Sequence, residues 1–249
     1  NDSRNKLTSD IVEVIESLIY NLCSFYDDAY SILVTLSEPS INNPNFAYDW
    51  LKANGYSNSA DYLKSYKHCM ELWINIVNRL KHNNQKLERI SIFDGTVIIS
   101  GFFVEGVSSD GSITPDPSIH SDMLKSTFGL SFERTVLMIF FTFYYLSDKL
   151  LVSVKKHLKD YYNFEFDKIS LKYTNDEEIV KIWKELSNTK YFFFPEEYKL
   201  KFPKITITGN LYKISYPHGD KIYQPKKFQT SITYTADGYS NKFNFPGNP

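Results

Sequence analysis

Hydrophobic residues between positions 63 and 87 recur alternately every three and four residues, which places them on one stripe of an α-helix. Asn84 is the only polar member of this stripe, which consists of Leu63, Tyr66, Met70, Trp73, Val77, Leu80, Asn84 and Leu87. At about 100° per residue, the opposite face gathers four polar side chains, namely Asn75, Arg79, His82 and Lys86. The pattern predicts one long amphipathic helix with a buried seam and a basic outer face.

The same spacing predicts another long helix before it, over residues 11–36. Asp10 and Glu13 are placed as a capping box at its start, and Pro39 follows its end. A short helix over residues 45–54 links the two long ones. Two long helices with matching seams and a compact connection are expected to pack antiparallel as a hairpin.

A third long helix is predicted from Ser131, which is suited to the N-cap position. Its residues are apolar nearly all round, so we expect it in the middle of the bundle. His157 stands in the basic run at its C-terminal end, where the helix dipole favours cations. A last helix is expected from residue 175 to residue 186.

Strand patterns appear in two places. Residues 96–105 are rich in β-branched and aromatic side chains and precede the turn signal of residues 108–112, so a β-hairpin insertion is predicted near 91–122. After Tyr191 the chain alternates like a sheet and predicts five strands separated by glycine-containing turns, at 199–206, 210–216, 221–223, 228–234 and 239–245.

These elements predict a mainly α fold: an antiparallel bundle of long helices with an inserted β-hairpin and a C-terminal antiparallel β unit, α+β overall. The expected domains are a helical bundle over residues 1–189 and a small, basic, aromatic-rich β unit over residues 190–249. A length of 249 residues accommodates this division.

Charge and composition narrow the functional classes. The net charge is −1, but residues 190–249 carry nine lysines against four acidic residues, a local charge of +5. Lysines interleaved with aromatic residues suit RNA binding, and they also suit a β unit whose edges are guarded by lysine. Two cysteines are too few for a disulfide framework, and the longest apolar run, residues 135–146, is too short to span a bilayer. A soluble, cytoplasmic protein without membrane contact is expected.

The clearest chemical signal is Arg79 and His82, which are i,i+3 neighbours on the predicted helix. Histidine can move the proton of a ribose 2′-hydroxyl, and arginine can stabilise the charge that develops on a phosphate. This chemistry requires neither a metal nor a cofactor, and we expect none. The candidate substrate-binding residues around the pair are Asn75, Lys81, Asn83 and Lys86. The alternative interpretation is the ordinary polar face of an amphipathic helix.

The segment Arg79-Leu80-Lys81-His82-Asn83 on the second helix of a predicted long-helix hairpin resembles the HEPN superfamily of bacterial toxin, phage-defence and RNA-processing proteins. The resemblance covers about residues 8–160. It implies a helical, homodimeric protein, a metal-independent endoribonuclease with RNA as partner, and a site formed by Arg79 and His82. HEPN sites commonly place the histidine four to six residues beyond the arginine, whereas Arg79 and His82 are separated by two residues. A non-catalytic binding or regulatory protein with a protein partner is therefore the alternative function.

Second-rank candidates lie in otherwise apolar segments: Glu105, His120 and Arg134. They predict either satisfied structural groups or a small-molecule site between Gly101 and Arg134. Asp116, His120 and Asp122 could coordinate a metal, but turn chemistry in a loop bounded by prolines explains them more simply.

Overall fold

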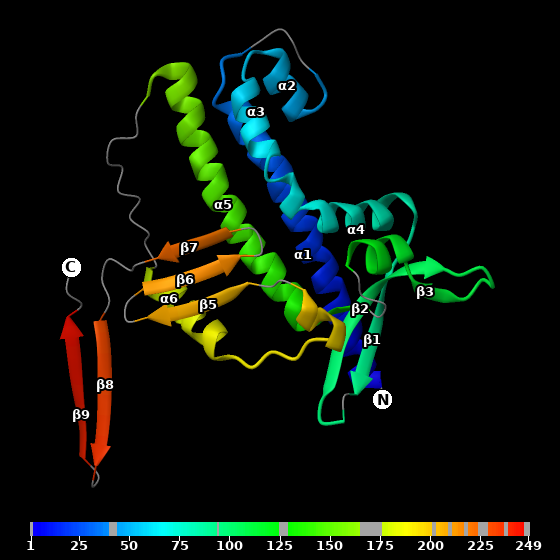
Figure 1. The fold of residues 1–249 in the computed structure, drawn as a ribbon, viewed down its shortest axis with the longest axis vertical. Helices are drawn as coiled ribbons and strands as arrows, with labels where there is room; N and C mark the ends of the chain where they lie inside the picture. Colours follow the sequence, from blue (N-terminus) through cyan, green and yellow to red (C-terminus); the bar gives the residue numbers. More distant parts are fainter. Residues whose placement is uncertain are drawn as a thin grey trace. The chain divides into compact units, whose positions relative to one another are not determined.

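The computed structural model describes residues 2–39, 44–93, 95–124, 129–164, 176–200, 203–208, 211–216, 219–223, 229–236 and 239–246. The chain is an α+β protein with antiparallel sheets, as the sequence predicts (Figure 1). It divides into two compact units. Unit 1 comprises Asn1–Ile169 and Tyr191–Phe202, and unit 2 comprises Ser170–Lys190 and Pro203–Pro249.

Two long helices, α1 (Asp2–Thr35) and α5 (Phe132–Tyr162), pack against each other in unit 1. They run in the same direction, because Phe25 lies against Phe143 while Ser37, just beyond α1, bonds to His157 (Figure 1). These two helices are therefore parallel to each other, not antiparallel as in the predicted bundle. Helix α1 begins at Asp2, before the predicted start at Asp10, since no proline or glycine interrupts the intervening residues.

The predicted long helix over residues 63–87 is broken into three pieces. They are α3 (Ser57–Lys64), the 3₁₀ turn η1 (Lys67–Cys69) and α4 (Glu71–His82). Asn84 ends the helical path with a φ of 53°, a left-handed conformation that asparagine tolerates, and Leu87 already belongs to a strand. Six seam residues are nonetheless buried as predicted: Leu63, Met70, Trp73, Val77, Leu80 and Leu87.

These pieces run back along α1, together with the short helix α2 (Ala47–Ala53). The Tyr26 hydroxyl donates to the Leu63 carbonyl at 3.4 Å, and the Lys81 ammonium lies over the Tyr20 ring. The interior of unit 1 is formed by apolar side chains from α1, α4 and the neighbouring sheet, with Leu22, Trp73 and Phe102 almost fully buried.

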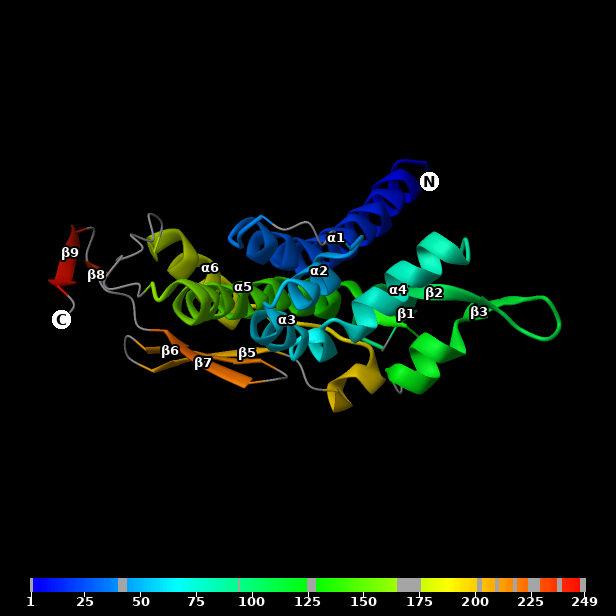
Figure 2. The same ribbon diagram turned by 90° about the horizontal axis from the view of Figure 1, so that it is seen from above.

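A four-stranded antiparallel sheet follows α4 (Figures 1 and 2). The central strand β2 (Ile98–Val107) pairs with β1 (Leu87–Phe93) on one side and with β3 (Ile113–Pro115) and β4 (Leu130–Ser131) on the other. The predicted strand over 96–105 is therefore confirmed. Its partner β1 begins at Leu87, the last residue of the predicted central helix, and ends inside the predicted hairpin insertion. Gly101 permits the close approach of β4, because a Cβ there would lie 2.1 Å from the Leu130 carbonyl oxygen.

Helix α5 begins directly after Ser131, as predicted, although the Ser131 side chain makes no capping hydrogen bond. His157 is not a dipole partner at the helix end. It lies five residues before the end of α5 and is buried. Its ring nitrogens form hydrogen bonds with Ser59 Oγ at 3.0 Å and Ser37 Oγ at 3.2 Å. By length and composition α5 also meets the requirement for a membrane-spanning helix, a criterion that core helices of globular proteins meet too.

Unit 2 contains α6 (Asp176–Asn188) and five strands close to the predicted ones. Strands β5 (Lys204–Thr208), β6 (Leu211–Tyr216) and β7 (Gly219–Tyr223) form one antiparallel sheet, and β8 (Gln229–Ala236) pairs with β9 (Tyr239–Pro246). The sequence-based boundary at 189/190 differs from this division, because α6 packs with β5 while residues 191–202 belong to unit 1. In residues 190–249, most of the predicted aromatic and lysine side chains lie outside the part of the chain that the structure describes. The turns at 209–210 and 237–238 also lie outside it.

Candidate functional site

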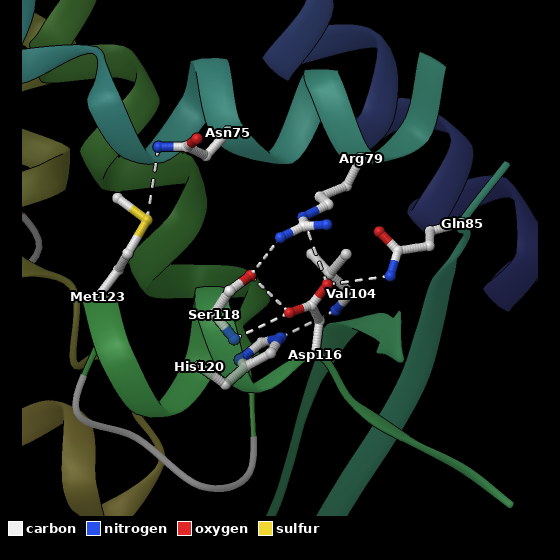
Figure 3. Close-up of polar contacts among 8 residues, drawn as sticks. All are labelled: Asn75, Arg79, Gln85, Val104, Asp116, Ser118, His120 and Met123. Carbon is white, nitrogen blue, oxygen red and sulfur yellow. Dashed lines mark hydrogen bonds and ion pairs between the residues drawn. The ribbon is translucent and has the colours of Figure 1, made fainter. Parts of the chain in front are cut away.

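One face of α4 is held by an ion pair with the loop that follows β3. Arg79 Nε lies 3.4 Å from Asp116 Oδ2, and Arg79 Nη2 donates to Ser118 Oγ at 2.8 Å (Figure 3). Ser118 begins the short helical segment η2 (Ser118–Met123). Arg79 therefore joins α4 to η2 with its guanidinium.

Asp116 is the centre of this arrangement, with its side chain 7% exposed. Its carboxylate accepts hydrogen bonds from the Ser118 amide (2.8 Å), the Ser118 hydroxyl (2.6 Å) and Gln85 Nε2 (2.9 Å). Burial acts to raise the pKa of Asp116, but these hydrogen bonds and the charge of Arg79 together hold it below its ordinary value. Asp116 consequently remains a carboxylate, and it starts η2 through an Asx-type turn.

His120, a second-rank candidate, is a structural acceptor in the same region. It is 1% exposed, and its Nε2 accepts the Val104 amide hydrogen at 2.9 Å, which links η2 to β2. This bond requires an unprotonated Nε2, so the hydrogen of the neutral ring resides on Nδ1. Burial lowers the pKa of His120 to about 4, against the opposing effect of Asp116. Nδ1 has no hydrogen-bond partner among the described residues.

Asn75 is exposed, and its side chain also contacts η2. Its amide nitrogen donates to the Glu71 carbonyl at 2.8 Å and lies 3.5 Å from Met123 Sδ (Figure 3). Asn75, predicted to bind substrate, and Arg79, predicted to be catalytic, thus both have contacts within the protein.

The adjacent face of α4 borders a cavity of about 850 Å³ between α1, the α2–α3 region and α4, which we call the tyrosine–lysine groove. Its size falls within the range of ligand pockets. Its lining combines aromatic, basic, acidic and small polar side chains: Tyr20, Cys23, Ser24, Tyr26, Asp27, Tyr30, Ser31, Asn45, Phe46, Ala47, Tyr48, Asp49, Lys64, Lys67, Ile74, Val77, Asn78, Lys81 and His82.

Two lysine ammonium groups lie over tyrosine rings in the groove. Lys81 Nζ lies 5.0 Å from the centre of the Tyr20 ring. Lys64 Nζ lies 4.6 Å from the centre of the Tyr48 ring and donates to its hydroxyl at 3.2 Å. Tyr30 packs edge-on against Tyr48 at 5.8 Å between ring centres. These cation–π contacts place lysine charges over the rings of Tyr20 and Tyr48.

The groove also contains groups with shifted pKa values. Burial, assisted by the charge of Asp28, raises the pKa of Asp27, while Lys81 acts in the opposite direction. Burial and the neighbouring Asp27 raise the pKa of the Cys23 thiol to about 12. With three lysines and His82 against two aspartates, the lining is more basic than acidic.

The predicted site residues are therefore divided by the fold. Lys81 and His82 line the groove, and Arg79 and Asn75 bind η2. No hydrogen bond or ion pair between the described side chains joins Arg79 to His82. Asn83 caps the end of α4, exposed to solvent.

The remaining candidates lie in other parts of unit 1. Lys86 has an exposed side chain, and its carbonyl accepts the amide of half-buried Glu105 at 2.8 Å. Buried Arg134 pairs with Glu197 at 3.9 Å, and the Glu197 carboxylate accepts the amide of Ser131 at 3.1 Å. These contacts are structural, and they form no common site with His82.

Sequence reasoning missed both Asp116 as the partner of Arg79 and the aromatic wall of the groove. A signal for the wall exists in α1, where polar and aromatic residues recur every three or four positions beside the apolar seam: Tyr20, Cys23, Asp27 and Tyr30. These four residues of α1 line a groove only because α4 packs beside them in the folded protein.

Among the described residues, no group of three or more histidine, cysteine, aspartate and glutamate side chains is placed to hold a metal ion. Comparison with protein-family models, curated proteins and solved structures finds no match to this chain. The fold and the groove define an α+β protein with a basic, aromatic-lined cavity.

Proposed function

We propose that this protein binds RNA in the tyrosine–lysine groove and cleaves it through His82, as a HEPN-like toxin or phage-defence ribonuclease that requires no metal. One observation carries the proposal: His82 and Lys81 share the lining of the groove with Lys64, Lys67 and several tyrosines. A proton-transfer group, phosphate-binding cations and stacking surfaces are the components that metal-independent RNA cleavage needs.

In this mechanism His82 accepts the proton of a ribose 2′-hydroxyl. The 2′-oxygen then forms a bond to the adjacent phosphorus, and the bond from phosphorus to the 5′-oxygen breaks. The product is a 2′,3′-cyclic phosphate, and the departing 5′-oxygen takes a proton from water. Lys81, the neighbour of His82 in the groove, offsets the negative charge that grows on the phosphate oxygens.

Arg79 has a different role from the one the sequence suggests. Its guanidinium is engaged by Asp116 and Ser118, so it acts as a positioning residue for α4. Because His82 is the last residue of α4, the placement of this helix determines where the imidazole stands in the groove.

The test is an RNA cleavage assay in EDTA that compares the wild type with His82→Ala. We expect cleavage by the wild type and none by the variant. Both proteins should unfold at nearly the same temperature, since an exposed substitution usually changes stability by less than about 0.5 kcal/mol. His68→Ala is the matched control, because His68 is also exposed and does not line the groove. Cleavage that persists in His82→Ala would remove this residue from the mechanism.

The engagement of Arg79 by Asp116 favours a second candidate function, a non-catalytic regulatory protein that binds a protein partner or a second copy of itself. This alternative predicts no RNA turnover and an assembly that charge reversal disrupts. Lys86→Glu is the suitable variant, because Lys86 is exposed whereas Arg79 supports the fold. If the wild type and Lys86→Glu have the same molecular mass in sedimentation analysis, this result would count against the regulatory-protein alternative.

A further inference from the structure

Phe46 is the feature of the groove that the fold itself does not use. This groove-lining residue immediately precedes α2, and its side chain is 70% exposed. A phenylalanine in the core would remove most of its apolar surface from water, so the Phe46 ring contributes little to folding where it stands.

The backbone that carries Phe46 is well anchored. The Phe46 carbonyl accepts the Trp50 amide at 2.9 Å in the first turn of α2, and Trp50 and Leu51 are buried against the rest of unit 1. An exposed ring on an anchored backbone position provides a preformed surface for a planar ligand.

Cations surround the same cavity. Lys64 and Lys67 lie at the end of α3 and in η1, and Lys81 lies on α4. Lys64 and Lys81 already contact the faces of Tyr48 and Tyr20, respectively. Aromatic faces with lysines between them are the pattern that binds single-stranded nucleic acid, in which bases stack on rings and phosphates lie near cations.

We propose that Phe46 stacks on an unpaired base of single-stranded RNA whose neighbouring phosphates contact Lys64, Lys67 and Lys81. This inference rests on the proposed function for the identity of the ligand as RNA. It adds the requirement for an unpaired strand, because the base faces of a duplex are covered by their neighbours and cannot reach Phe46.

The experiment measures fluorescence anisotropy of a labelled uridine-rich 12-mer, and of a duplex of equal length, with His82→Ala protein in EDTA. This background prevents cleavage during the titration. Phe46→Ala is expected to weaken binding of the single strand about tenfold, as loss of one base stack does, and Phe46→Trp to restore it. Phe93→Ala is the matched control, because Phe93 is 67% exposed on β1 and does not line the groove.

Each outcome decides the matter. Equal affinities of Phe46→Ala and its parent, an equal loss in Phe93→Ala, or equal binding of the duplex would overturn the stacking role. If wild-type protein binds RNA in a Phe46-dependent way but does not cut it, the ribonuclease proposal fails and the stacking site stands. If Phe46→Ala binds RNA as tightly as its parent and the wild-type protein cuts RNA, the stacking site fails and the ribonuclease proposal stands.

Discussion

Arg79 and His82 lie three residues apart on α4, yet Arg79 reaches Asp116 beside η2 whereas His82 lines the groove next to α1. The pair that looks like one catalytic unit in the sequence therefore serves two purposes in the fold. Arg79 holds the helix, and His82 borders the groove.

Replacing Asp116 with asparagine should lower the free energy of unfolding by about 2 kcal/mol, because charge-assisted hydrogen bonds and the ion pair with Arg79 are weakened. Chemical denaturation measures the change. The pKa of Asp116 is lowered in the folded protein, so its contribution is present above about pH 4 and disappears as the pH falls through the lowered pKa. Asp122→Asn, an exposed change in the same segment, should leave stability unaltered. Equal effects of the two substitutions would contradict the assigned role.

His120 should make the protein less stable as the pH falls from about 6.5 to 4. The unfolded chain takes up a proton on this histidine near its ordinary pKa, whereas the folded protein does so only near the lowered value of about 4. The loss from this one group amounts to roughly 3 kcal/mol over the interval.

His120→Gln should flatten the pH dependence, and its amide oxygen can still accept the Val104 amide hydrogen. Denaturation curves at several pH values measure the difference. His68→Gln, at an exposed site, should retain the slope of the wild type. A slope that is identical in all three proteins would show that His120 does not control it.

Glu197→Gln should be strongly destabilising, by about 3 kcal/mol, because it leaves the buried Arg134 guanidinium without this carboxylate. Adding Arg134→Met should recover part of the loss, since an apolar side chain tolerates the buried position. Thermal and chemical unfolding of the single and double variants tests both statements. Glu196→Gln, one position away and half-buried, should change stability much less. A double variant no more stable than Glu197→Gln would count against charge burial as the cause.

The Cys23 and Cys69 thiols should react slowly in the native protein. Burial raises the pKa of each thiol to about 12, and Asp27 adds to the effect at Cys23. At pH 8 only a fraction on the order of 10⁻⁴ is thiolate, the reactive form. Titration with a disulfide reagent should show slow labelling without denaturant and rapid labelling of both cysteines in guanidinium. Rapid native labelling would show that the thiols are more accessible or more acidic.

Lys67→Glu should weaken RNA binding and reduce its salt dependence. If Lys67 contacts a phosphate, removing it lowers the slope of log affinity against log salt concentration by about 0.7, the value for single strands. Reversing the charge should do at least as much. Anisotropy titrations at several salt concentrations measure the slope. Lys155→Glu is the control, because Lys155 is exposed on α5 and does not line the groove. The same decrease in both variants would indicate a general charge effect instead of a bound phosphate.

The apolar spacing proved a better guide to burial than to helix length. Leu63, Trp73 and Leu80 are buried as their spacing predicts, although η1 interrupts the helix between the first two. Burial follows from side-chain chemistry, whereas the break depends on how α3 and α4 each pack on α1. Asn84 had looked like a polar seam residue, but it is the left-handed residue after α4.

The sequence by itself determined the α+β class, the two long helices, most strands and the burial of the central seam, because these depend on local periodicity and turn chemistry. Only the tertiary structure decided which face of α4 meets η2 and which borders the groove. Arg79 and Asp116 are 37 positions apart, as are Tyr26 and Leu63, and no local pattern encodes such contacts. They arise from packing whole elements together, and this packing divides one polar helix face between an anchor to η2 and the wall of a groove.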